Sequence, residues 1–284
     1  MDSISKQVFI EDQYPGVTIG VINHTRGLVM IDAPPSPEDG RSWRASLMGL
    51  STGPERVLVN LDAHPDRTLG VRTMDCSVIA HEKTAQVFRN RPSTFKAQSD
   101  DAGANWEAIP GLTGIRWVPP EISFTTNMSL EWGDTPILLE SHPGPSAGAI
   151  WVILPEEKIV FVGDAVLKNQ PPFLARADLP PWIETLALLQ SKPYSEYTVI
   201  SGRGGAVTPA LIKSQSDFLK DAHKRLERLS KRKQKPDMTE SLVQLLLSKF
   251  KVPNTRHKQF TQRLRYGLKH YYQRHYHPGP NNDD

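Results

Sequence analysis

The fold is decided by residues 60–70, which read Asn-Leu-Asp-Ala-His-Pro-Asp-Arg-Thr-Leu-Gly. A short apolar strand is predicted directly before them, from Arg56 to Asn60. Side chains two apart share one side of an extended segment, so Asp62, His64 and Asp66 can converge on one point. Two carboxylates around an imidazole are typical of an oxygen-rich metal site. The other interpretation is an Asp- and Pro-rich turn with an exposed histidine.

Three later segments share the pattern of a strand that ends in glycine and polar residues. They are residues 141–148 (Ser-His-Pro-Gly-Pro-Ser-Ala-Gly), 159–164 (Ile-Val-Phe-Val-Gly-Asp) and 200–204 (Ile-Ser-Gly-Arg-Gly). With the loop at 62–70, they resemble in order and spacing the metallo-β-lactamase superfamily, whose signature is His-x-His-x-Asp-His followed by glycine. The resemblance covers about residues 7–208. It implies an α+β fold, a four-layer αββα sandwich with its site along one edge of the two sheets.

The departures from the family pattern concern the metal ligands. By this resemblance, the first zinc site uses the positions of Asp62, His64 and Pro145, and Asp164 bridges to the second. The second site uses the positions of three further residues, Asp66, Arg67 and Arg203. Proline has no donor atom on its side chain, and arginine remains protonated and repels a dication. The sequence therefore argues against a two-zinc centre.

Two interpretations of the remaining pocket stay open. In the first, Asp62, His64 and Asp164 hold one divalent metal (Zn, Fe or Mn), and Asp66 is the catalytic base that orients or deprotonates a bound water. Arg67 or Arg203 would then bind an anionic substrate group or a developing oxyanion.

In the second interpretation no metal binds. Arg67 and Arg203 bring two positive charges into the space of the second ion, and they pair with the three aspartates because guanidinium forks match carboxylates. His142, three residues before Pro145, either reaches this pocket from a strand end or has a structural role.

Charge and periodicity divide the chain near residue 210. Residues 1–210 hold 17 Lys/Arg against 24 Asp/Glu, whereas residues 211–277 hold 17 against 5. From Pro209 onward the apolar spacing predicts three long helices, over about 210–231, 239–250 and 255–272. We therefore expect a metallo-β-lactamase-like domain at 1–208, a basic helical region at 209–277 and a frayed tail at 278–284.

The basic helices interleave cationic and aromatic side chains, as in proteins that bind nucleic-acid backbones and stack bases. We favour the simpler interpretation, in which their apolar residues pack on the acidic body and the charges stay solvated.

Composition excludes several classes of protein. The 284 residues are 38% hydrophobic and 23% charged, with no apolar run long enough for a membrane-spanning helix. One cysteine excludes an internal disulfide framework, and the mixed-charge N-terminus lacks a signal-peptide pattern, so the cytoplasm is the expected location.

Three functions remain open. The first is a divergent hydrolase of a small-molecule ester, thioester, lactone or amide, with an eroded metal centre that holds at most one metal. The second is an inactive binding or scaffold protein with a salt-bridged pocket. The third is nucleic-acid binding through the basic helices. The sequence leaves the oligomeric state open.

Overall fold

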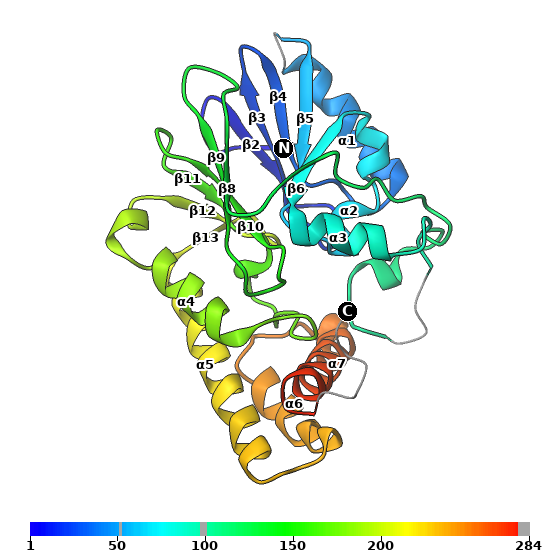
Figure 1. Cartoon of the computed structure of the whole chain (residues 1–284), viewed down its shortest axis with the longest axis vertical. Helices are drawn as coiled ribbons and strands as arrows, with labels where there is room; N and C mark the ends of the chain where they lie inside the picture. Colours follow the sequence, from blue (N-terminus) through cyan, green and yellow to red (C-terminus); the bar gives the residue numbers. More distant parts are fainter. Residues whose placement is uncertain (51–52, 97–100, 278–284) are drawn as a thin grey trace.

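A computed structural model describes residues 1–50, 53–96 and 101–277, and shows two β-sheets that face each other (Figure 1). The first sheet has the order β1-β2-β3-β4-β5-β6-β7, antiparallel from β1 to β4 and parallel from β4 to β7. Its strands are β1 (Asp2–Ser3), β2 (Val8–Glu11), β3 (Ile19–His24), β4 (Gly27–Ile31), β5 (Glu55–Val59), β6 (Ser77–His81) and β7 (Ile122–Phe124).

The second sheet has the order β13-β12-β11-β10-β9-β8, and only its β11–β12 pair is parallel. Its strands are β8 (Asn127–Leu130), β9 (Ile137–Ser141), β10 (Ile150–Leu154), β11 (Ile159–Phe161), β12 (Thr198–Ile200) and β13 (Ala206–Val207). All five residues of β10 are buried, as expected for a strand covered on both faces.

Alternate side chains of the inner strands pack into different hydrophobic clusters. In β4, Val29 and Ile31 lie between the sheets, whereas Leu28 and Met30 face the outer layer. Gly20 of β3 allows close approach of the sheets, because a Cβ atom there would lie 2.5 Å from the ring of Phe161.

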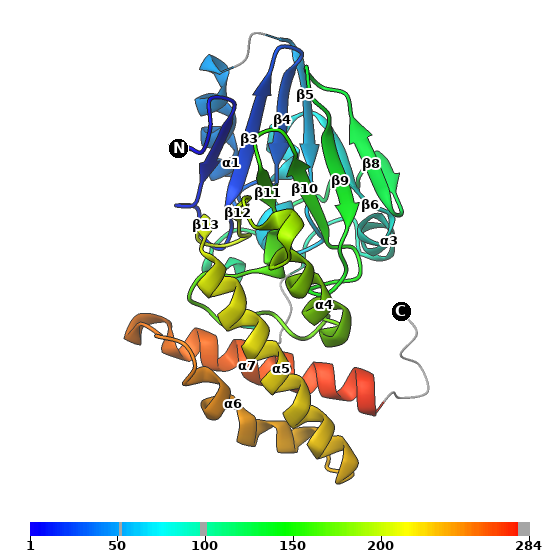
Figure 2. The same cartoon turned by 90° about the vertical axis from the view of Figure 1, so that its left-hand side faces the viewer.

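Helices cover both outer faces (Figure 2). Trp43 of α1 packs on the first sheet, and Ser36 caps α1 by accepting hydrogen bonds from Glu38 N and Asp39 N. The helices are α1 (Pro37–Ser46), α2 (Pro65–Thr68), α3 (Glu82–Asn90), α4 (Leu179–Leu189), α5 (Pro209–Lys231), α6 (Glu240–Leu247) and α7 (His257–Tyr276). Short 3-10 turns are η1 (Leu47–Gly49), η2 (Val71–Met74), η3 (Trp106–Ala108), η4 (Gly163–Ala165), η5 (Lys192–Tyr194), η6 (Pro236–Thr239) and η7 (Asn254–Arg256). The predicted α+β sandwich is confirmed.

The C-terminal helices gather beyond one end of the sandwich (Figure 2). One hydrophobic cluster joins them to the outer face of the second sheet: Trp151 and Val160 of the sheet share it with Leu219 of α5 and Leu264 of α7. Their exposed ion pairs lie within the helical region, as in Arg265–Glu240. Apolar burial therefore holds these helices on the sandwich. The domain boundary at 208 stays a prediction, and the expected frayed tail lies outside the described residues.

The structure differs from the sequence expectations in its shorter elements. The loop predicted over 62–70 contains the helix α2, and the strands β1, β2, β7, β8 and β13 were not predicted. Within the described part of the chain, no helix is long and apolar enough to cross a membrane.

The shared cluster predicts that α7 unfolds together with the sandwich. Leu264 is fully buried, so Leu264→Ala should lower the free energy of unfolding by about 2–5 kcal/mol in a single urea transition. The matched control is Leu245→Ala on α6, where a leucine that is 44% exposed should change stability by less than about 0.5 kcal/mol. A separate early transition of the helices alone would contradict this prediction.

Candidate functional site

The candidate site lies where four strands end at one edge of the sandwich. Asp32 follows β4, Asp62 follows β5, Asp164 follows β11, and Arg203 follows β12. The strands of each pair, β4–β5 and β11–β12, are parallel, so their carboxyl ends bring these side chains together. Each of the four residues is at most 5% exposed.

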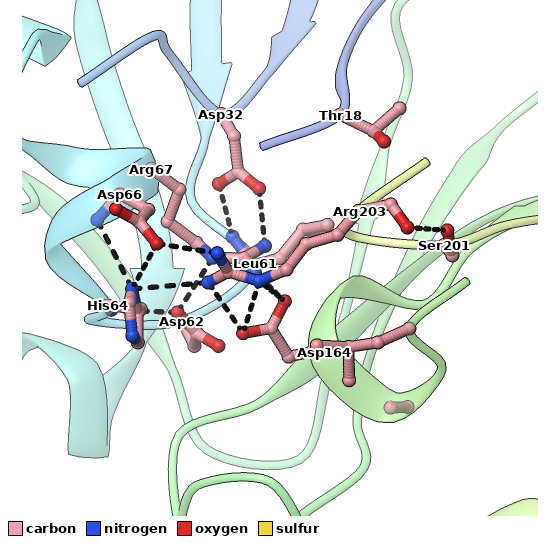
Figure 3. Close-up of polar contacts among 12 residues, drawn as sticks. Thr18, Asp32, Leu61, Asp62, His64, Asp66, Arg67, Asp164, Ser201 and Arg203 are labelled. Carbon is pink, nitrogen blue, oxygen red and sulfur yellow. Dashed lines mark hydrogen bonds and ion pairs between the residues drawn. The ribbon is translucent and has the colours of Figure 1, made fainter. Parts of the chain in front are cut away.

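Arg67, from α2, is fully buried among three carboxylates (Figure 3). Its Nη1 donates to Asp32 Oδ2 at 2.8 Å, and its Nη2 forms an ion pair with Asp164. Its Nε lies 3.0 Å from Asp62 Oδ1, as an ion pair without the alignment of a hydrogen bond. The Arg67 guanidinium therefore occupies the centre of the pocket.

Asp32 completes the surroundings of Arg67 and was not among the predicted site residues. Its Oδ1 accepts a hydrogen bond from Leu61 N at 3.0 Å. Burial raises the pKa of Asp32 to about 6, although the charge of Arg67 acts in the opposite direction. The signal in the sequence that could have identified Asp32 is its position directly after an apolar strand.

Arg203 binds the other side of the pocket. Its Nε and Nη2 donate to the two carboxylate oxygens of Asp164 at 3.1 and 3.0 Å, and its Nη1 donates to Asp66 Oδ2 at 2.5 Å. Burial alone would raise the pKa of Asp164, but Arg203 and Arg67 hold it well below its usual range. The ion pairs expected by the metal-free interpretation are present.

His64 is part of the same network as a neutral ring. Its Nδ1 accepts a hydrogen bond from Asp66 N at 3.2 Å, which caps α2, and it lies 3.3 Å from Arg203 Nη2. Burial and the charge of Arg203 lower the pKa of His64 to about 3. The nitrogen that faces the pocket is therefore already engaged.

A third arginine closes the pocket and was missed as a site residue. Arg263 of α7 lies over the ring of Phe173, whose centroid is 4.0 Å from the Arg263 guanidinium carbon and 4.5 Å from that of Arg203. The contacts of Arg263 are oxygens of neutral groups: Gly103 O, Gln170 Oε1, Pro171 O and Asn105 Oδ1, at 2.8–3.2 Å. Burial, and next the charge of Arg203, lower its pKa to about 9.

The segment around Trp106 also covers the pocket. Trp106 N donates to Asp66 Oδ1 at 2.7 Å, so both oxygens of this fully buried carboxylate are engaged. Asp66, the predicted catalytic base, thus anchors the segment that covers the site.

His142, the other residue predicted near the pocket, has different partners. Its ring stacks on Trp151 at 3.7 Å between centroids, and its Nε2 hydrogen-bonds with Glu140 at 3.2 Å. These contacts give His142 a place along β9 and β10 rather than in the arginine network.

A sequence model described as "Metallo-beta-lactamase superfamily" matches residues 15–202. The match spans most of the sandwich and includes the carboxyl ends of the four strands at the site. The chain therefore belongs to the metallo-β-lactamase superfamily. A comparison with curated protein sequences found no match.

Solved structures show the same fold. A metallo-beta-lactamase from Pontibacter korlensis is 22% identical, with a TM-score of 0.60 over 77% of this chain and 97% of its own. The DIM-1 metallo-beta-lactamase is 19% identical, with a TM-score of 0.60 over 78% of this chain and 96% of its own.

A third structure extends the likeness to the C-terminal helices. The inverting sec-alkylsulfatase Pisa1 from Pseudomonas sp. is 13% identical, with a TM-score of 0.71 over 99% of this chain. This chain spans about half of that protein, as the alignment covers 50% of it.

Zinc, which the family implies, does not fit the donor set as it is arranged here. The carboxylates of Asp62, Asp66 and Asp164 each contact a guanidinium, and His64 Nδ1 accepts a backbone N–H. Among the described residues, no group of three or more His, Cys, Asp and Glu side chains is placed to hold a metal ion. A dication would have to displace both arginines.

The buried ion pairs predict a large loss of stability when one charge is removed. Arg203→Ala leaves Asp66 and Asp164 without their shared cation and should lower the free energy of unfolding by about 3–5 kcal/mol. The matched control is Arg265→Ala, which removes an exposed bidentate pair with Glu240 and should cost at most about 1 kcal/mol. Urea unfolding measures both, and equal losses would contradict a buried network.

The lowered pKa of His64 predicts that its ring stays neutral between pH 5 and 8. The folded pKa of about 3 lies below the unfolded value of 6.5, so the stability that His64 contributes is present above pH 6.5 and is lost as the pH falls toward 3. NMR of the ring protons, assigned with His64→Gln, should show flat shifts between pH 5 and 8. A midpoint near pH 6.5 would show that the pocket is open to water.

Proposed function

We propose that this protein is a catalytically inactive member of its superfamily, which keeps the sandwich as a binding or scaffold fold. The observation that carries this proposal is the placement of Arg67 and Arg203, at most 2% exposed, against Asp62, Asp66 and Asp164. Each carboxylate that could activate water or hold a metal is paired with one of these guanidinium groups.

The surroundings of Asp66 support the absence of hydrolysis. A general base must accept a proton from a water or substrate within hydrogen-bond reach. Both oxygens of Asp66 already accept hydrogen bonds, from Arg203 and from Trp106 N, and the side chain has no exposed surface. The Phe173 ring packs against the guanidiniums of both Arg203 and Arg263, which adds to the enclosure of the pocket.

The competing proposal is a one-metal hydrolase of a small ester, thioester, lactone or amide. It would place Zn, Fe or Mn on Asp62, His64 and Asp164, with Asp66 as base. The similar solved structures include β-lactamases and an alkylsulfatase, which are hydrolases by name. This function needs Arg67 and Arg203 to leave the pocket, so the metal content of the protein decides between the two.

Nucleic-acid binding is less favoured than either. Three of the five aromatic side chains that alternate with the basic residues of α7, Phe260, Tyr271 and Tyr272, are at most 2% exposed and cannot stack on bases. We retain the cytoplasm as the proposed location on the ground of composition.

Metal analysis of untagged protein tests the proposal. We expect less than about one tenth of a metal ion per chain by mass spectrometry, and no change in Tm with EDTA or added Zn²⁺, because arginines occupy the pocket. The control variant His275→Gln/His277→Gln removes imidazoles at the end of α7 that could retain stray metal.

The contradicting result is one tightly held metal per chain that persists in the control variant and is lost in Asp164→Asn. Hydrolysis of a panel of aryl esters, thioesters and lactones, again lost in Asp164→Asn, would likewise establish the one-metal hydrolase.

A further inference from the structure

A half-open cavity of about 500 Å³ lies beside α1, and none of its lining residues belongs to the buried network of arginines and aspartates. Nine residues of α1, of η2 and its flanks, and of the segment before Trp117 line it: Pro37, Arg41, Arg44, Leu69, Arg72, Thr73, Asp75, Ile115 and Arg116. The volume lies within the range of small-molecule sites, roughly 300–1,000 Å³.

The charge of this cavity is unbalanced. Four of the nine lining residues are arginines, and the only lining carboxylate, Asp75, pairs with Arg44 at 3.2 Å. Arg41, Arg72 and Arg116 are exposed and have no ion pair with a residue of the described ranges. Three arginines without an ion pair in the described ranges thus line one cavity, in a part of the chain, residues 1–210, whose acidic residues outnumber its basic ones.

Two of the walls, α1 and the turn η2 with its flanks, pack closely against each other. A Cβ atom on Gly40 of α1 would lie 2.1 Å from Thr73 Oγ1, and one on Gly70 would lie 2.0 Å from the carbonyl oxygen of Pro34. Thr73 Oγ1 also donates to Gly70 O at 2.7 Å. The helix α1 and the turn η2 are therefore packed as one unit, and little backbone ordering is needed when a ligand enters.

Apolar atoms form most of the lining surface. Leu69, Ile115 and Pro37 lie among the arginines, and Leu69 belongs to the hydrophobic cluster of Trp106 and Trp117. A ligand that matches this surface has a carbon body for the apolar part and anionic oxygens for the guanidinium forks. A monocarboxylate would leave two of the three charges uncompensated.

We propose that this arginine-lined cavity binds a small organic polyanion of the phosphate-ester or diphosphate class. This proposal rests on the binding role proposed above and names a class of ligand for it. Its test does not depend on the metal content, so the failure of one leaves the other standing.

Isothermal titration calorimetry at low salt tests the site with four probes: inorganic phosphate, pyrophosphate, adenosine diphosphate and citrate. We expect adenosine diphosphate and pyrophosphate to bind more tightly than phosphate and than citrate, and tighter binding of citrate would overturn the phosphate class of the ligand. Arg72→Ala and Arg116→Ala should each weaken the tightest probe by about tenfold or more, because each removes a charge-assisted contact.

The matched control is Arg232→Ala, which removes an exposed arginine from the basic end of α5, outside the cavity. It should leave the affinity unchanged, and circular dichroism should show that all three variants fold. Absence of binding by every probe at millimolar concentration would overturn the proposal. An equal loss in Arg232→Ala, or binding only of a 20-nucleotide single strand that depends on α5–α7, would overturn it too by showing nonspecific attraction to the basic helices.

Discussion

Two guanidinium groups surrounded by aspartates are the constraint on which the rest of this structure depends. Arg67 and Arg203 share Asp164, and each also binds an aspartate from α2 or from a strand end. Burying charges is costly unless hydrogen bonds and opposite charges compensate them. The edge where the two sheets meet is therefore held by ionic groups that come from both sheets and that must all be present together.

The same network also attaches the segments that cover this edge of the sandwich. Asp66 binds Arg203 with one oxygen and fixes Trp106 N with the other, so the segment around η3 is attached to the pocket. Phe173 lies between the guanidiniums of Arg203 and Arg263 and links the pocket to α7. From their charge alone, the C-terminal helices would be expected to form a solvated appendage. Instead, the buried Arg263 and a shared hydrophobic cluster make them part of the site.

The sequence led to the sandwich through the resemblance of its strand-ending motifs, in order and spacing, to a known superfamily, and Pro209 marks a helix start that the structure contains. It also indicated which charges could pair, since arginine cannot serve as a metal ligand. It did not identify Asp32 or Arg263 as site residues, because neither lies in the motifs at 62–70, 141–148, 159–164 and 200–204. Strands β7 and β8 were missed because they are only three and four residues long and mostly exposed, so they show no sustained apolar pattern.

Because the Arg67 guanidinium is covalently part of the chain, the stability of this fold depends on the medium in a different way from that of a metal-binding protein. A metal ion exchanges with the medium, so a protein that needs one gains or loses stability with the free ion concentration. A guanidinium is synthesised with the chain and cannot be removed by a chelator or replaced by a competing ion. Every copy of the polypeptide therefore carries the positive charge at this edge, whatever the concentration of metal ions in the medium.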